Sequence, residues 1–528
     1  MLKIDQYIEV GLQMISRKRA TRVERLNRPQ RLRMAFEELG PTYIKLGQIL
    51  STRPDLVPMD YIEELSKLQD KIPAFAFDRV RKLISAEFGM PPADLFESLE
   101  EEPFASASIG QVHRAVLKDG EAVAVKFQRP GIQKIIEVDL EIMLHLATLA
   151  ERHIEEFSFH RPVKIVEEFA KTLEKEIDYK NEATNMERVA RHFLDDPHVY
   201  IPKVYRETTT TRVLTTEFID GIKISDIESI EAAGLDRTIL TARGADLVLK
   251  QIFVHGFFHA DPHPGNIFVL PDNVICLLDF GMTGIVDRQT REDFVDLLDS
   301  IVHQNEIRVA QVLLKLTYWE HEPERRQFER EVADFMGRHL YKPLKDIELG
   351  KLLHQLLELA TGLRLRIPPD IFLMMKAFST VEGVGHMLDP DFDMIAQATP
   401  FITEVKLARY KPQRIADDVY ELGARLLHFF QQFPKDLLDL ANLVRQQRLR
   451  LQIEHRGLET MLATHDRISN RISFSILIAA LIIGSALIVI SETPPLIYGI
   501  SLIGILLFSA AALMGIWLLV AILRKGKL

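Results

Sequence analysis

Two segments near the middle of the chain read His259-Ala260-Asp261-Pro262-His263-Pro264-Gly265-Asn266 and Leu277-Leu278-Asp279-Phe280-Gly281. An aspartate, an asparagine five positions later and a second aspartate followed by Phe-Gly form the arrangement that phosphoryl transfer uses. In that arrangement one acid lies near the acceptor, while an amide and a second acid hold magnesium. Asp279 lies 13 positions after Asn266, which leaves room for a short hairpin. We therefore predict that Asn266 and Asp279 meet at adjacent loop ends as Mg²⁺ ligands, because hard oxygen donors suit this ion.

The histidines around the first segment offer a competing interpretation. His255, His259 and His263 are spaced by four residues, as metal ligands on one helix face would be. Pro262 and Pro264 forbid a regular helix there, because proline lacks an amide hydrogen and clashes with the preceding turn. A zinc or iron site is therefore the weaker interpretation.

Upstream, the segment Glu121-Ala122-Val123-Ala124-Val125-Lys126-Phe127 is rich in valine and lies between Asp119-Gly120 and Pro130-Gly131. This pattern predicts one strand of a two-strand hairpin. Lys126 has the position in which kinases keep the lysine that pairs with nucleotide phosphates and with a glutamate on a helix. A lone strand lysine is usually only a surface residue, so this assignment depends on the other motifs.

A loop of small residues precedes that strand, where a glycine-rich phosphate-covering loop would be expected. Small side chains let backbone amides approach phosphate oxygens, although alanine and serine allow the backbone less freedom than glycine. Without context the segment is simply a small-residue turn. The candidate cofactor-binding residues in it are Ala105, Ser106, Ala107, Ser108, Ile109, Gly110, Gln111 and Val112.

The remaining pattern is a mixture of helices and short strands. Helices are predicted within 31–70, broken at Pro41 and Pro54, then through 132–195, and almost continuously from 289 to 466. Further strands are predicted at 213–219, 267–270 and 274–278.

Composition excludes several classes of protein. The 528 residues are 47% hydrophobic and 27% charged, which excludes a disordered polymer and a collagen-like fibre. Cys276 is the single cysteine, so there is no intramolecular disulfide and no cysteine-based zinc site. The net charge of -10 argues against a nucleic-acid partner.

The C-terminal region differs sharply from the rest, because neither 472–490 nor 496–523 contains a charged residue. Each run can span a bilayer, which takes about 20 apolar residues. Pro494-Pro495 breaks the helix between them, so an antiparallel hairpin is predicted. Positive residues at both outer ends place the termini in the cytoplasm; they are Arg467, Arg471, Arg524, Lys525 and Lys527. The alternative is a buried helical pair in a soluble core.

The N-terminal region carries acids at Asp5 and Glu9 and has no uninterrupted apolar stretch, which argues against a secretory signal. A bacterial chain fits better than one with an organelle transit peptide. A basic stretch follows, which either contacts anionic lipid or is a solvated helix face; it comprises Arg17, Lys18, Arg19, Arg22, Arg25, Arg28, Arg31 and Arg33.

Taken together, these motifs resemble the UbiB family of atypical protein-kinase-like proteins, also called the ADCK family, which is associated with ubiquinone biosynthesis. Lys45-Leu46-Gly47-Gln48 matches the family's Lys-x-Gly-Gln motif, and Glu176-Ile177-Asp178 matches its Glu-x-Asp motif. The small-residue loop and the two central segments match as well. The resemblance covers nearly the whole chain and is weakest over about 291–370.

Carried over to these positions, the resemblance implies roles for individual residues. Lys126 and Glu182 would form the phosphate-positioning ion pair, with Asp261 at the catalytic-base position. Glu217 and Ile219 would lie where the hinge backbone meets adenine. The Lys-x-Gly-Gln segment would fold over the site where a protein substrate would bind, with its lysine and glutamine facing Glu176 and the nucleotide phosphates. The implied regulatory residues are Lys45, Gln48, Glu176 and Asp178.

The resemblance implies an α+β, atypical protein-kinase-like fold with a small β-containing N-lobe and a helical C-lobe. We expect a helical N-terminal extension at 1–100, the N-lobe at 101–221, the C-lobe at 222–400, a helical linker at 401–470 and a transmembrane hairpin at 471–523.

The implied function is that of an ATPase or small-molecule kinase with ATP and Mg²⁺ as cofactors, supporting ubiquinone biosynthesis at the bacterial inner membrane. Its implied partners are membrane lipid, prenylated quinone precursors and quinone-biosynthesis enzymes, and a homodimer is left open. The alternative is a nucleotide-binding scaffold or chaperone that needs no phosphoryl transfer. A redox enzyme is disfavoured, since no Gly-x-Gly-x-x-Gly follows a strand.

Overall fold

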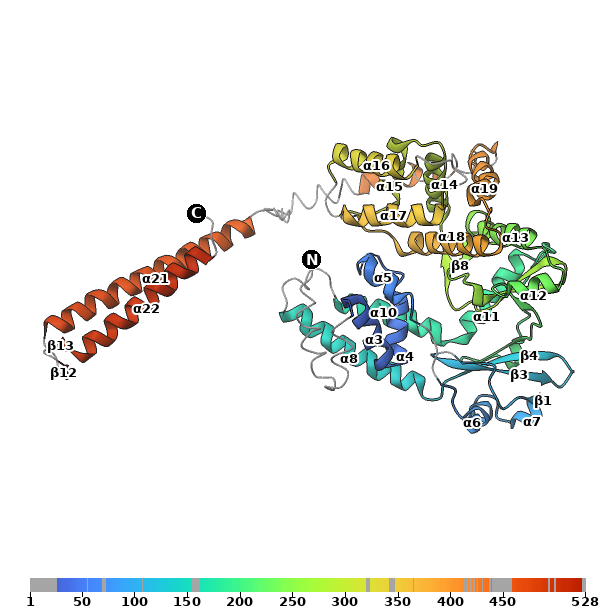
Figure 1. The fold of residues 1–528 in the computed structure, drawn as a ribbon, viewed down its shortest axis with the longest axis horizontal. Helices are drawn as coiled ribbons and strands as arrows, with labels where there is room; N and C mark the ends of the chain where they lie inside the picture. Colours follow the sequence, from blue (N-terminus) through green and yellow to red (C-terminus); the bar gives the residue numbers. More distant parts are fainter. Residues whose placement is uncertain are drawn as a thin grey trace. The chain divides into compact units, whose positions relative to one another are not determined.

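The computed structural model in Figure 1 describes residues 26–524, except 55, 69–72, 107, 154–161, 320–322, 341–346, 364, 413, 415, 417–419, 421–422, 425, 430, 436–437, 439–457, 492–493 and 498–499. The chain divides into two compact units, residues 1–418 and residues 419–528. Helices predominate and the strands form small antiparallel or mixed sheets, so the α+β prediction is confirmed.

The first sheet of the larger unit is antiparallel, in the order β1-β3-β4-β6, with β2 paired to β3. The predicted hairpin is confirmed, and Figure 1 shows β3 and β4 side by side. Alternate residues of β4, such as Val125 and Phe127, are buried against helix α6, which leaves Lys126 on the opposite face. The bounds are β1 (Phe96–Leu99), β2 (Ala105–Ser106), β3 (Gly110–Leu117), β4 (Ala122–Gln128), β6 (Val213–Glu217) and α6 (Phe77–Phe88).

The predicted strand at 213–219 is two residues too long, because β6 ends at Glu217. The last pairing of this segment with β4 is the bond from the Phe218 amide to the Ala122 carbonyl, and β4 itself begins at Ala122. Ile219 therefore lies beyond the sheet, in the link that leads to the second lobe.

Three short helices precede the sheet: α3 (Arg28–Leu39), α4 (Pro41–Leu50) and α5 (Met59–Leu65). The predicted break at Pro41 is confirmed, because α3 ends at Leu39. Pro41 itself begins α4, since its fixed φ suits the first turn and it has no amide hydrogen to lose. Gly47 lies where α4 packs tightly on its neighbours. A Cβ there would come within 2.2 Å of Leu68 Cδ1 and 2.8 Å of Phe36 Cδ2.

The helices predicted within 132–195 are confirmed as α8 (Ile132–His153), α10 (Pro162–Ile177) and α11 (Tyr179–His192). A second sheet follows, in the order β5-β10-β9-β7, from β5 (Val199–Tyr200), β7 (Ile222–Lys223), β9 (Ile267–Leu270) and β10 (Val274–Leu277). The predicted strand at 274–278 is thus one residue too long.

The second lobe is helical around one large apolar core, as predicted for the stretch after 289. It starts with α12 (Ile227–Ala232), α13 (Arg237–Leu249) and a π-helical turn, η2 (Lys250–His255), and contains the paired strands β8 (Phe257–His259) and β11 (Thr283–Ile285). The later helices are α14 (Arg288–Val302), α15 (Glu306–Leu316), α16 (Arg325–His339), α17 (Leu349–Gly362), α18 (Pro369–Leu388) and α19 (Met394–Ala408).

In the smaller unit, α21 (Leu458–Ile490) and α22 (Leu502–Arg524) form an antiparallel pair. By length and composition, 468–490 and 502–519 can each cross a membrane. The second helix starts at Leu502 rather than at Leu496, because 496–497 and 500–501 pair as two short strands. Ser485 and Ala511 are buried, and a Cβ on Gly504 would come within 2.5 Å of Val489, so small residues let the helices approach closely.

Candidate active site

Lys126 lies between two acidic side chains from different elements. Its Nζ donates to both carboxylate oxygens of Glu182, at 3.0 and 2.9 Å, and lies 3.8 Å from Asp279 Oδ2. Strand β4 supplies the lysine, helix α11 the glutamate and the loop after β10 the aspartate. The structure thus brings together three residues that are up to 153 positions apart in the sequence.

Lys126 and Asp279 stabilise each other's charge, whereas burial, together with the Asp279 charge, raises the pKa of Glu182. Burial by itself would lower the pKa of Lys126, but the nearby Asp279 and Glu182 carboxylates raise that pKa well above its ordinary value. The Lys126 charge in turn lowers the pKa of Asp279 to about 2. Lys126 is therefore cationic and Asp279 anionic at neutral pH, which is the state that phosphate and metal binding require.

The hairpin predicted between Asn266 and Asp279 is confirmed as β9 and β10, with Ile267 opposite Leu277. The Leu278 amide donates to the Asn266 carbonyl at 2.9 Å, so the two loop ends are adjacent. Asp279 has a left-handed φ of 52°, and its Oδ1 accepts from the Gly281 amide at 3.0 Å.

A magnesium ion fits the chemistry of this pair. Asn266 Nδ2 donates to the Asp261 carbonyl at 3.4 Å, which leaves the amide oxygen as a donor for a metal. Asp279 adds an ionised carboxylate, and oxygen donors of these two kinds are typical of magnesium sites.

Asp261 makes an ion pair that the sequence motifs did not predict. Lys376 Nζ, on helix α18, lies 3.1 Å from Asp261 Oδ1, and both side chains are partly buried. The backbone of Asp261 is held by its own loop, through bonds to the His263 amide at 2.7 Å and to His259 Nδ1 at 3.1 Å.

The small-residue loop is ordered by its contacts at the N-lobe. Gly110 is required there, since a Cβ would come within 2.5 Å of both the Tyr179 hydroxyl and the Phe127 carbonyl. Val112 is opposite Lys126 and shares its face, whereas Gln111 is opposite Phe127 and points into the N-lobe interior.

The Gln111 side chain is therefore engaged away from Lys126. It accepts from the Phe75 amide and donates to the Phe75 carbonyl, at 2.8 and 3.2 Å. Ile109 and Ser108 are buried, Ala105 is exposed and Ser106 is half-buried, while Ala107 lies outside the described residues.

At the expected hinge, the side chain of Glu217 is held by two hydrogen bonds. Its carboxylate accepts from the Tyr200 hydroxyl at 2.6 Å and from the Lys203 amide at 3.2 Å. Ile219 is half-buried two residues further on. Because the Glu217 carboxylate is engaged in this way, a contact of Glu217 with an adenine ring would come from its backbone.

The Lys-x-Gly-Gln and Glu-x-Asp motifs meet. Lys45 Nζ lies 2.5 Å from Glu176 Oε1, and both side chains are largely buried. Gln48 Nε2 donates to the Leu68 carbonyl at 3.4 Å. Asp178 caps helix α11 by accepting from the Lys180 amide at 3.0 Å, so it positions the helix that carries Glu182.

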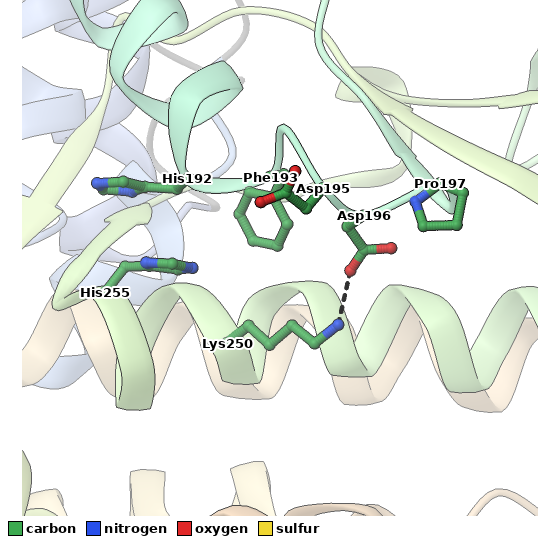
Figure 2. Close-up of a pocket in the computed structure, with 7 residues that line it drawn as sticks. All are labelled: His192, Phe193, Asp195, Asp196, Pro197, Lys250 and His255. Atoms are coloured by element: carbon green, nitrogen blue, oxygen red, sulfur yellow. Dashed lines mark hydrogen bonds and ion pairs between the residues drawn. The ribbon is translucent and has the colours of Figure 1, made fainter.

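The structure gives each of the three histidines of the competing metal interpretation a different environment. His255 stacks on His192, with ring centroids 4.3 Å apart, beside a cavity of about 400 Å³ that Figure 2 shows. His259 is buried in β8, and His263 Nδ1 accepts from the Gly265 amide at 2.7 Å.

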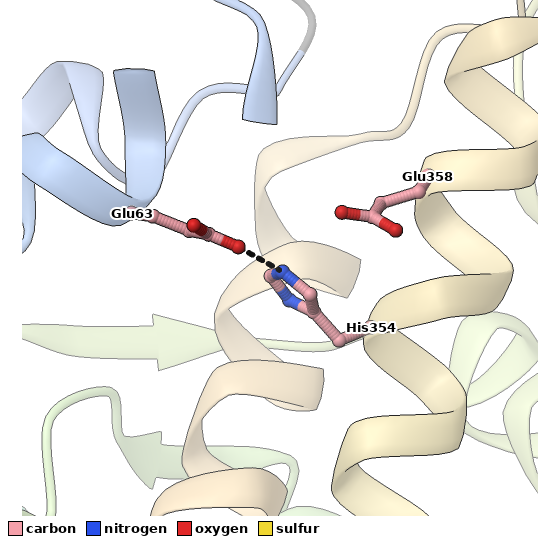
Figure 3. A group of neighbouring side chains, drawn as sticks. All are labelled: Glu63, His354 and Glu358. Atoms are coloured by element: carbon pink, nitrogen blue, oxygen red, sulfur yellow. Dashed lines mark ion pairs between the residues drawn. The ribbon is translucent and has the colours of Figure 1, made fainter. Parts of the chain in front are cut away.

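One other group has metal-like spacing among the described residues. Glu63 of α5 faces His354 and Glu358 of α17, and Figure 3 shows the three side chains. His354 Nε2 lies 4.0 Å from Glu63 Oε1. Both glutamates are exposed, and the cluster serves here as a contact between the N-terminal helices and the second lobe.

Sequence reasoning missed three residues at the site. Asn185 Nδ2 donates to the Phe280 carbonyl at 3.1 Å, which fixes the Asp-Phe-Gly loop on α11. Tyr179 is buried beneath Lys126, whose Nζ lies 5.2 Å from the ring centroid. Asn185 and Tyr179 flank Glu182 on α11, so helical spacing could have indicated them; Lys376 has no such local signal.

Together, a strand lysine paired with a helix glutamate and the Asp-Asn and Asp-Phe-Gly loops define a kinase-like protein. Comparison with known families agrees. The ABC1 atypical kinase-like domain matches residues 67–313, the UbiB helical domain residues 332–393, and the ABC1/UbiB kinase-like C-terminal domain residues 456–524.

Individual relatives agree with this assignment. A Marinobacter nauticus protein named probable protein kinase UbiB is 35% identical over 78% of this chain and 75% of its own length. An uncharacterised Synechocystis protein is 40% identical over 70% of this chain, which spans 63% of that relative. The chain belongs to the ABC1/UbiB atypical kinase family.

A solved structure supports the fold alone. Rv3197 from Mycobacterium tuberculosis, solved in complex with erythromycin, matches with a TM-score of 0.50 at 23% identity, covering 75% of this chain and 98% of that one.

Proposed function

We propose that this protein is an ATP-dependent enzyme, an ATPase or small-molecule kinase that supports ubiquinone or related prenyl-quinone biosynthesis. The observation that carries the proposal is the placement of Lys126 between Glu182 and Asp279. A cation fixed by two carboxylates beside a magnesium-type donor pair is what nucleotide phosphates require.

In this proposal Lys126 binds nucleotide phosphate oxygens and Glu182 holds its ammonium in place. Asp261 accepts the proton of the attacking hydroxyl or water. Asn266 and Asp279 hold the magnesium ion, which, when bound, neutralises phosphate charge. The loop from Ala105 to Val112 and the backbone at Glu217 and Ile219 border the nucleotide.

The acceptor is proposed to be water or a small, lipid-like molecule rather than a protein. The buried Lys45–Glu176 pair supports this proposal. It joins α4 to α10, the helix that precedes the Glu182-bearing α11, so the N-terminal helices would lie where a protein substrate would otherwise bind. Lys45, Gln48, Glu176 and Asp178 would then regulate access to the site.

The prenyl-quinone assignment is supported by relatives named UbiB. The two apolar helices support a place in the bacterial inner membrane, with the body and both termini in the cytoplasm. Membrane lipid, prenylated quinone precursors and their biosynthetic enzymes are the proposed partners, and homodimer formation is compatible with the proposal.

The test is Mg²⁺-dependent ATP turnover by the detergent-solubilised full chain, with and without a prenylated phenol and anionic lipid. Turnover should be lost in Asp279→Asn, which keeps the side chain's size but removes a charge, and should rise with the prenylated phenol. Nucleotide binding without turnover under any of these conditions would favour the scaffold function instead.

A further inference from the structure

Helix α18 places a lysine against the one acid that the motifs assign to the acceptor side of the site. Lys376 Nζ and Asp261 Oδ1 are 3.1 Å apart, although the residues are 115 positions apart in the sequence. We infer that Lys376 is a positioning residue, which holds the Asp261 carboxylate in the orientation that proton transfer needs. This inference rests on the proposed function.

The position of Lys376 is fixed by the core rather than by solvent. Its neighbours Met374, Met375 and Ala377 are buried, and the ring of Phe378 packs edge-on against Phe253 and Phe294. Lys376 is the only lysine or arginine of α18. A cation in such a helix is costly unless it is paired, and Asp261 supplies the partner.

The helix itself is anchored by a buried acid. Glu382, which is 4% exposed, accepts from the amides of Leu349 and Gly350 at 2.8 and 2.6 Å, and so ties α18 to the start of α17. Both helices lie within the matched helical domain at 332–393. The helical domain therefore contributes a side chain to the active site.

The ion pair with Lys376 determines which oxygen of Asp261 is available to accept a proton. Lys376 contacts Oδ1, which leaves Oδ2 for the acceptor proton. When the acceptor oxygen bonds to the γ-phosphorus, its proton passes to Asp261 and the bond from phosphorus to the bridging oxygen of ADP breaks. An Asp261 side chain free to rotate would meet the acceptor less often in the productive geometry.

The test compares Lys376→Met, which removes the charge, with Lys376→Arg, which keeps it, in Mg²⁺-dependent ATP turnover by the full chain. We expect kcat to fall about 100-fold in Lys376→Met, with KM for ATP nearly unchanged, and to be largely retained in Lys376→Arg. Lys406→Met is the matched control, because Lys406 pairs with Asp299 at 2.8 Å away from the site.

A double-mutant cycle separates positioning from a general structural effect. In an Asp261→Asn background, Lys376→Met should change kcat by less than about twofold, because the charge it orients is already gone. Independent, multiplying losses would overturn the inference, as would a Lys376→Met variant as active as wild type. Absent turnover in the wild type, with nucleotide still bound, would instead refute the proposed function.

Discussion

At the scale of the residue, Lys126 is the positive charge that balances the two acids of the site. Its ammonium is shared between Glu182 and Asp279, and neither acid has another lysine or arginine within ion-pair distance among the described residues. Removing the lysine leaves the two carboxylates without their shared ion-pair partner, so their negative charge would repel a polyphosphate and weaken the fold.

We therefore predict that Lys126→Met weakens ATP binding at least about 30-fold, which isothermal titration in Mg²⁺ buffer would measure. Lys406→Met is the control, since Lys406 pairs with Asp299 at 2.8 Å away from the site. Equal affinities of Lys126→Met and wild type would show that nucleotide phosphates do not bind at this lysine.

The stacked His192 and His255 rings make stability depend on pH. Burial lowers the pKa of both imidazoles, and for His255 the charge of Lys250 adds to the effect. The unfolded chain therefore binds more protons than the folded chain near and below the ordinary histidine pKa of about 6.5, and stability falls as the pH drops through that range.

The prediction is that the midpoint of thermal unfolding falls more for wild type than for His255→Gln between pH 7.5 and pH 5.5. A glutamine keeps hydrogen-bonding capacity but cannot protonate, so the difference between the two proteins isolates the contribution of His255. Parallel losses in both proteins would assign the pH dependence to other groups.

At the scale of the element, the glycine of the Lys-x-Gly-Gln motif has a packing role. Gly47 lets α4 approach the side chains of Phe36, Leu65 and Leu68, which places Lys45 toward Glu176 on the adjacent helix. A methyl group at position 47 has no space unless these buried side chains move.

Gly47→Ala should consequently lower the free energy of unfolding by about 1–2 kcal/mol, despite the better helix propensity of alanine. Gly337→Ala is a matched control in helix α16, where a Cβ meets nothing within 4 Å and a neutral or stabilising effect is expected. Denaturant unfolding of both variants would measure the difference. Equal stabilities would mean that the cluster around α4 repacks freely.

The sequence predicted those elements that are specified by residues close together in the chain. The β9–β10 hairpin followed from the spacing of 13 positions between Asn266 and Asp279, and the β3–β4 hairpin followed from Asp119-Gly120 and the adjoining valines. The end of β6 was missed by two residues, because its pairing partner β4 lies far away in the sequence. The end of β10 was missed by one residue, because its pairing with β9 stops at Leu277, opposite Ile267. The Lys376–Asp261 pair joins distant segments through the core, and no local pattern encodes it.

At the scale of the whole molecule, contacts between distant segments hold residues 1–418 together as one unit. The Thr42 hydroxyl donates to Asp139 Oδ2 at 2.5 Å, and the Arg53 guanidinium lies 3.3 Å from Glu168 Oε2. These contacts join the N-terminal helices to α8 and α10. Arg33, part of the predicted basic stretch, pairs with Glu37 and Glu64, while residues 17–25 of that stretch lie outside the described residues. Membrane attachment is therefore best tested at the C-terminal helices.

The single cysteine makes the topology of those helices directly measurable. Cys276 is fully buried, so a membrane-impermeant maleimide should label only a cysteine introduced on the surface. In right-side-out bacterial vesicles we predict labelling of Ser491→Cys, at the end of α21 between the spans, and none of His465→Cys, which precedes them. His465→Cys should be protected because arginines and lysines at the outer ends of the helices hold these ends in the cytoplasm. Lysis of the vesicles should allow both cysteines to be labelled. Equal labelling of both in intact vesicles would exclude a membrane-spanning hairpin, and the reverse pattern would place the kinase-like domain outside the cell's ATP pool.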